Sequence, residues 1–97
     1  MPFSVRFKNN KVLNMVKKMP VLEQKKLANL IEDLSVSGPI QKNWRNFSSI
    51  GINKYHCHLS YKWVACWEYF EEKDISIKNI IKVIEVYYAG SREDAPY

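Results

Sequence analysis

The C-terminal segment carries the residue types best suited to chemistry. An apolar run over residues 80–89 stops at Gly90, and residues 91–97 then read Ser-Arg-Glu-Asp-Ala-Pro-Tyr. A predicted buried strand is therefore followed within a few residues by four functional groups. These are the guanidinium of Arg92, the carboxylates of Glu93 and Asp94, and the phenol of Tyr97. Such groups can bind a phosphate or move a proton, whereas a frayed polar terminus is the simpler alternative. The segment predicts a site at the end of a sheet.

Two histidines form a second group of candidate residues. His56 and His58 are two positions apart in a predicted strand, so their side chains share one face of the sheet. The next strand is expected to pair with this one about a turn centred on Tyr61 and Lys62, so that His56 faces Trp67. This register completes the histidine face with three aromatic side chains: Trp63, Trp67 and Tyr69.

The sequence leaves three interpretations of this face open. Two imidazoles can bind a metal, but no carboxylate or thiolate accompanies them there. The rings can instead pack structurally on a curved sheet. The third interpretation is a nucleotide-binding surface, because aromatic rings stack on bases while lysine and arginine hold phosphates. Histidine also titrates near neutral pH. With Arg92 and Tyr97 arriving from the adjacent strand, the third is the most specific prediction.

The two cysteines predict buried thiols. In the expected register Cys57 faces Cys66 beneath the helices, yet a reducing compartment favours paired thiols over a disulfide. The spacings of a zinc site are absent. We therefore expect neither a metal nor a cofactor.

The remaining elements follow from hydrophobic spacing. Residues 3–7 alternate as in a short strand, and a first helix runs from a cap at Asn9 or Asn10 to Pro20. A second helix ends at Gly38-Pro39. Its apolar stripe consists of Leu27, Leu30, Ile31 and Leu34.

The C-terminal half predicts strands. We expect an extended segment near 40–49, a turn near 51–54, strands over 55–59 and 63–70, a charged loop over 71–74 and a last strand over 80–89. The predicted fold is a single α+β domain over residues 1–97 with the order β-α-α-β-β-β-β. A helical hairpin would cover one face of a mainly antiparallel sheet.

Charge and hydropathy restrict the class of protein. The formal net charge of +5 and a pI of about 9.3 are typical of small domains that bind nucleic acid or acidic proteins. The start of the chain does not resemble a signal peptide, and no apolar run has the length of a membrane span. We expect a cytoplasmic protein without a membrane partner.

Several segments together resemble the RelE/ParE superfamily of bacterial toxins, above all the RelE-like cytotoxic translational repressors of type II toxin–antitoxin systems. The resemblance covers most of the chain and is strongest from Gly38 to Tyr97. The segments that carry it are Gly38–Phe47, Tyr55–Leu59, Val64–Glu68, Ile84–Gly90 and Ala95–Tyr97. It implies a RelE-like fold of the microbial-ribonuclease type. It also implies a metal-independent endoribonuclease that cleaves mRNA in the ribosomal A site, and a cognate antitoxin that forms a hetero-oligomer with the toxin.

The resemblance also implies roles for individual residues. Arg92 matches the family's phosphate-binding arginine, and Tyr97 matches the C-terminal tyrosine that orients the substrate base. His56 or His58 would donate or accept the proton, and Lys54 would bind phosphate. Trp63 and Trp67, on the predicted histidine face, would complete the substrate-binding surface. Compared with lysine-based RelE proteins, this chain has fewer basic residues near the site and an extra stretch around residues 73–79.

Two alternative functions share this fold. ParE-like members inhibit DNA gyrase without catalysis, and an inactive module would bind only its antitoxin. The histidine and aromatic face beside Arg92 favours RNA cleavage, and no feature specifically indicates gyrase.

Overall fold

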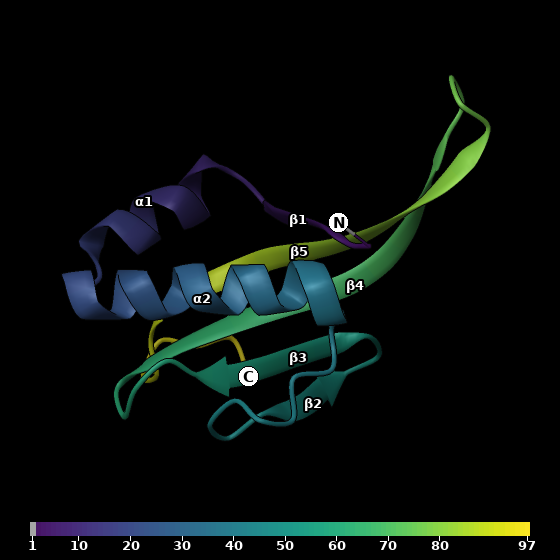
Figure 1. The fold of residues 1–97 in the computed structure, drawn as a ribbon. Coiled ribbons are helices and arrows are strands. Elements are labelled where there is room, and N and C mark those ends of the chain that lie inside the picture. The colour runs from purple at the N-terminus through teal and green to yellow at the C-terminus, as the bar shows by residue number, and fades with distance from the viewer. Residues whose placement is uncertain (1) are drawn as a thin grey trace.

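The computed structural model describes residues 2–97 (Figure 1). The elements are β1 (Ser4–Phe7), α1 (Asn10–Lys18), α2 (Val21–Ser37), β2 (Ser48–Gly51), β3 (Lys54–His58), β4 (Trp63–Asp74) and β5 (Asn79–Ser91). The strands form one sheet in the order β1-β5-β4-β3-β2, in which only β1 and β5 are parallel. The predicted α+β class, element order and mainly antiparallel sheet are confirmed.

Local sequence signals set the helix ends. The Asn9 side chain accepts the N–H of Val12 at 3.1 Å and caps α1. Pro20 joins the two helices, and α2 ends at Gly38, where φ is 92°. A Cβ at Gly38 would lie 2.7 Å from Cζ of Phe3, so both the backbone angle and the close approach require glycine.

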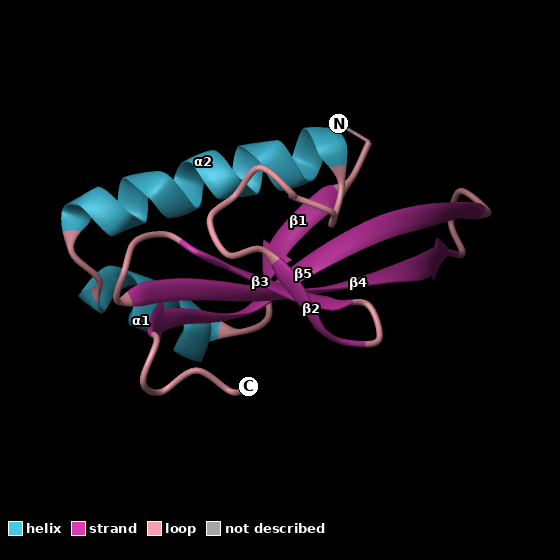
Figure 2. Ribbon diagram, turned by 90° about the horizontal axis from the view of Figure 1, so that it is seen from below, coloured by secondary structure: helices cyan, strands magenta, loops and turns pink. Residues whose placement is uncertain are grey.

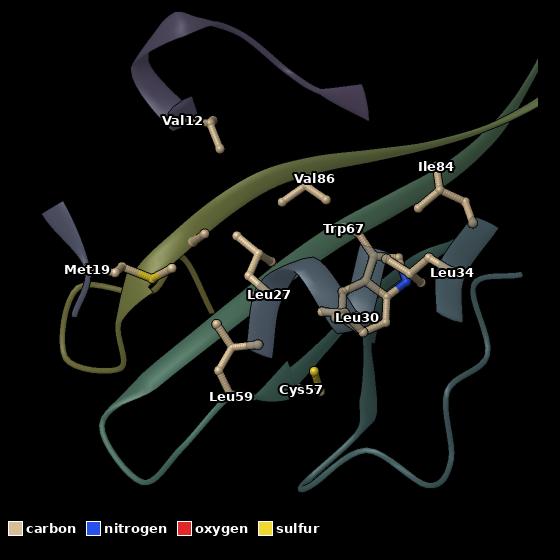
Figure 3. Packing of buried hydrophobic residues seen from close by; sticks show 12 residues of the cluster. Val12, Met19, Leu27, Leu30, Leu34, Cys57, Leu59, Trp67, Ile84 and Val86 are labelled. Atoms are coloured by element: carbon tan, nitrogen blue, oxygen red, sulfur yellow. The ribbon is translucent and has the colours of Figure 1, made fainter. Parts of the chain in front are cut away.

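The core lies between α2 and one face of the sheet (Figure 3). The side chains of Leu27, Leu30 and Leu34 are almost completely buried and belong to the same cluster as Trp67 and Val86. These leucines follow the predicted apolar stripe of the helix. No helix within residues 2–97 has the length and hydrophobicity that a membrane crossing requires.

The pairing of β3 with β4 differs from the predicted register by one residue. His56 pairs with Cys66, and Tyr55 pairs with Trp67. Because side chains alternate across a strand, this shift moves Trp67 from the histidine face to the helix-covered face. It also separates Cys57, which joins the core, from Cys66, which lies on the histidine face.

The turn explains the register. The backbone N–H groups of Leu59 and Ser60 both donate to the carbonyl of Trp63, at 2.8 and 3.2 Å, which centres the loop on Tyr61. One sequence signal was available: the predicted register would place Glu68 beneath the helices, where an unpaired carboxylate is costly. In the observed register Glu68 lies opposite Lys54, on the histidine face.

Three predicted boundaries change. Residues 71–74 are not a charged loop, because β4 continues to Asp74 and pairs with β5 as far as Asn79. The acidic side chains are tolerated there because the hairpin projects into solvent, and Glu72 forms an ion pair with Arg6 at 2.7 Å. The extended segment expected near 40–49 is a series of turns followed by β2 at Ser48, and the last strand reaches Ser91 instead of ending at residue 89.

Candidate active site

The C-terminal segment folds back over the face of the sheet opposite α2 (Figure 2). The backbone N–H of Arg92 donates to the carbonyl of Lys62 at 2.7 Å, and the Tyr88 hydroxyl donates to the carbonyl of Ser91 at 2.7 Å. Ala95 packs against a small buried cluster formed by Val64, Cys66 and Tyr88. The segment is therefore anchored at its start, and its last residue lies against β3.

His56 and Tyr97 form the closest aromatic pair of this face. Their ring centroids are 4.3 Å apart, and the imidazole of His58 lies 5.8 Å from that of His56. Both histidines are buried, whereas Tyr97 is 51% exposed. The Nδ1 atom of His56 lies 3.0 Å from Oγ of Ser48, its cross-strand neighbour on β2. Nε2 of His56 is then the ring nitrogen that remains for a substrate.

Burial controls the electrostatics of the two histidines. It lowers the pKa of His56, and hydrogen bonding to the backbone of Ser48 opposes this shift. Burial also lowers the pKa of His58, which the charges of His56, Arg92 and Arg45 lower further. Both imidazoles therefore favour the neutral form near pH 7, which suits a proton acceptor.

Arg92 supplies a cation beside this pair. Its guanidinium lies 4.9 Å from the ring centroid of Tyr61, and the two residues line a cavity of about 220 Å³ together with Trp63. Within residues 2–97 Arg92 forms no ion pair, so its charge is available to an anionic ligand. Burial raises the pKa of Tyr97, and the charge of Arg92 opposes that shift.

Lys54 lies two positions before His56 on β3 and therefore on the same face. Its Nζ atom is 5.8 Å from the ring centroid of Tyr87. Tyr87 is the extra residue of a β-bulge, because Cys66 pairs with Tyr88 while the next residue, Trp67, pairs with Val86. Tyr87 also packs against the small cluster of Val64, Cys66 and Tyr88, so it lies on the same face as Lys54.

The two predicted tryptophans do not join the histidines. Trp67 is completely buried, and its indole N–H donates to the carbonyl of Pro39 at 3.0 Å. It cannot stack on a base, so its predicted substrate-binding role is wrong. Trp63 is half-buried against the core and reaches only the small cavity beside Arg92. The one-residue register shift accounts for both placements.

Three residues near the histidines escaped the sequence prediction. Ser48 contacts His56, Arg45 lies near enough to lower the pKa of His58, and Tyr61 lies beneath the guanidinium of Arg92. The signal for Ser48 was the two-residue turn at 52–53, which makes β2 the direct neighbour of β3. Arg45 and Tyr61 lie in loops, and no periodicity places them.

No group of three or more histidine, cysteine, aspartate or glutamate side chains within residues 2–97 is arranged to hold a metal ion.

The fold is similar to that of a solved structure, the archaeal RelE–RelB complex from Pyrococcus horikoshii OT3. The TM-score is 0.65, the match covers 98% of this chain and 100% of that chain, and the sequence identity is 12%. No family model matches the sequence, and no curated protein matches it. The similarity shows that the chain has the RelE fold, which agrees with the fold that the sequence resemblance implied.

Proposed function

We propose that the chain is the toxin of a toxin–antitoxin pair and acts as a metal-independent endoribonuclease that cleaves mRNA on the ribosome in the cytoplasm. Two observations support this proposal: the RelE fold, and the cluster of His56, His58, Tyr97 and Arg92 on the face opposite α2. The close, tilted pair of the His56 and Tyr97 rings carries most weight. It combines a buried, neutral imidazole with an exposed aromatic ring able to contact a base.

The proposed reaction begins at the 2′-hydroxyl of the RNA. Nε2 of His56 accepts the hydroxyl proton, and the 2′-oxygen attacks the adjacent phosphorus. The phosphorus–5′-oxygen bond breaks, which leaves a 2′,3′-cyclic phosphate on one fragment and a 5′-hydroxyl on the other. His58 donates the proton that the 5′-oxygen takes up, and it does so from its protonated form, which is the minor form near pH 7 because burial and nearby positive charges lower its pKa. The atoms balance without a metal or a co-reactant.

The cations stabilise the transition state. Negative charge builds up on the phosphorane oxygens, and a positioned guanidinium in a partly dry site is well suited to balance it. Arg92 fills this role, Lys54 holds a neighbouring phosphate and Tyr97 stacks on the base next to the cleaved bond. Trp67 has no part in this mechanism, because it lies in the core.

The proposed partner is an antitoxin that covers this site. The solved relative is a RelE protein in complex with RelB. A net charge of +5 favours a partner with acidic segments, because complementary charge increases association rates and specificity. The complex would be a toxin–antitoxin hetero-oligomer.

Induced expression without an antitoxin tests the proposal. The wild-type chain should arrest growth, and primer extension should reveal new mRNA ends within translated codons. His56→Ala and Arg92→Ala should abolish both effects, Tyr97→Ala should reduce them, and Tyr97→Phe, which keeps the stacking ring, should retain them. Tyr69→Phe is the matched control, because it removes a phenol that bonds Glu71 away from the site.

Intact mRNA during growth arrest would refute the proposal. If arrest then coincided with loss of DNA supercoiling and survived the His56→Ala change, a gyrase inhibitor would be the better explanation. Harmless expression of the wild-type chain would indicate an inactive, antitoxin-binding module.

A further inference from the structure

A second groove begins where the candidate active site ends. It has a volume of about 660 Å³ and lies between α2 and the loop before β2, with Lys26, Trp44, Arg45 and His58 among its lining residues. His58 lines this groove and also lies beside the tilted pair of His56 and Tyr97. The two regions therefore share His58, and the volume of the groove is within the range of about 300–1,000 Å³ that is typical of small-ligand pockets.

The wall of this groove is held in place by hydrogen bonds. Buried Gln41 donates to the carbonyls of Asp33 and Gly38 at 3.2 and 2.8 Å. The Trp44 indole donates to the Asp33 carboxylate at 2.8 Å, and the carbonyl of Arg45 accepts from the N–H of His58 at 2.8 Å. The loop is thus fixed to both α2 and β3. Such preorganisation lowers the cost of binding a ligand.

The chemistry of the groove fits an anion with a planar ring. Lys26 and Arg45 supply two cations, and neither forms an ion pair within residues 2–97. The carboxylate of Asp33 already accepts the Trp44 indole N–H, and Trp44 itself is only half-buried. A half-buried indole beside free cations is the arrangement that binds single-stranded nucleic acid.

We propose that this groove binds the nucleotide next to the two that flank the cleaved bond, one of which stacks on Tyr97, with Arg45 on its phosphate and Trp44 against its base. The inference rests on the proposed ribonuclease function and extends it. It makes Arg45 a substrate-binding residue and assigns the groove a role in the choice of sequence beside the cleaved bond. The ligand is a segment of single-stranded RNA.

Titration with short oligonucleotides tests the inference on the full chain. The probes are a dinucleotide and a trinucleotide with 2′-O-methyl groups, which block cleavage. The readouts are the NMR signals of the Trp44 indole N–H and of the Tyr97 ring. The trinucleotide should move both signals with one dissociation constant, and the dinucleotide should move only that of Tyr97. The Trp44 signal is identified by its loss in Trp44→Phe.

The variant Arg45→Gln distinguishes a specific contribution of the groove to RNA binding from the effect of the protein's net positive charge. It should weaken trinucleotide binding about tenfold, as expected for one lost charge-assisted hydrogen bond, and leave dinucleotide binding unchanged. Lys25→Gln is the matched control, since Lys25 is an exposed cation of α2 outside the groove. It should change neither affinity more than about twofold, because screened surface charge contributes little.

Three results would overturn the inference. A Trp44 signal that the trinucleotide leaves unmoved, or an Arg45→Gln variant that weakens both probes equally, would show that the groove holds no nucleotide. If hexaglutamate moved the Trp44 signal at the same concentration as the trinucleotide does, the groove would accept any polyanion. After any of these results the proposed ribonuclease function would still stand, provided that cleavage depends on His56. If neither probe moves the Tyr97 signal, both proposals fail together.

Discussion

The hydroxyl of Ser48 offers a direct test of the proposed base. It lies 3.0 Å from Nδ1 of His56, and the backbone of Ser48 also bonds the imidazole in a way that favours its protonated form. We therefore assign the ring N–H of neutral His56 to Nδ1, which donates toward Ser48, and the lone pair to Nε2. Ser48→Ala removes the hydroxyl and leaves the backbone contact in place.

The expected size of the effect follows from one hydrogen bond. A typical bond contributes about 0.5–1.5 kcal/mol, which corresponds to about a two- to tenfold change in the population of the correct tautomer. Cleavage by Ser48→Ala should fall by that factor. The backbone contact that raises the pKa of His56 is retained in this variant, so the acid limb of the pH–rate profile should stay in place.

Single-turnover cleavage on programmed ribosomes measures the rate, and ¹⁵N NMR of the imidazole reports the tautomer. Ser48→Thr keeps the hydroxyl and should retain the wild-type rate. Ser49→Ala is the matched control, because its hydroxyl donates to the carbonyl of Gly51 at 3.1 Å and not to a histidine. An unchanged rate and tautomer in Ser48→Ala, or an equal loss in Ser49→Ala, would refute the reasoning.

Three further predictions concern pH, stability and the thiols. Cleavage needs a neutral base and a protonated acid, and the pKa values of His56 and His58 are both lowered from 6.5. The initial rate of cleavage should therefore be highest below pH 6.5 and should decline as the pH rises. A maximum above pH 6.5 would contradict the assignment of the two histidines. Trp67→Ala should lower the free energy of unfolding, measured by urea denaturation, by about 3–5 kcal/mol. Trp63→Ala should lower the free energy of unfolding clearly less, because Trp63 is only half-buried. Equal losses in the two variants would argue against the observed register of β3 and β4. Cys57 and Cys66, whose pKa values burial raises to about 12, should react with a thiol reagent only in denaturant, so rapid labelling of the native chain would show that they are accessible.

Prediction from sequence worked where the signals were local. The apolar stripe of α2, the cap at Asn9 and the stop at Gly38 each depend on contacts within a few residues, and each has the predicted effect. Prediction failed for the pairing of β3 with β4, because the register depends on the loop around Tyr61. That loop can be centred on Tyr61 or between Tyr61 and Lys62, and this half-residue difference shifts the register by one residue.

The sequence by itself determined the fold class, the order of elements and the presence of His56, His58, Arg92 and Tyr97 near strand ends. These properties follow from hydrophobic periodicity and from the fixed alternation of side chains along a strand.

Only the tertiary structure decided which groups meet. It placed Tyr97 on His56, brought Ser48 to the imidazole and buried Trp67 beneath α2. The physical reason is that a one-residue shift in register exchanges the two faces of a strand at little local cost, so the packing of the whole sheet against the helix makes the choice.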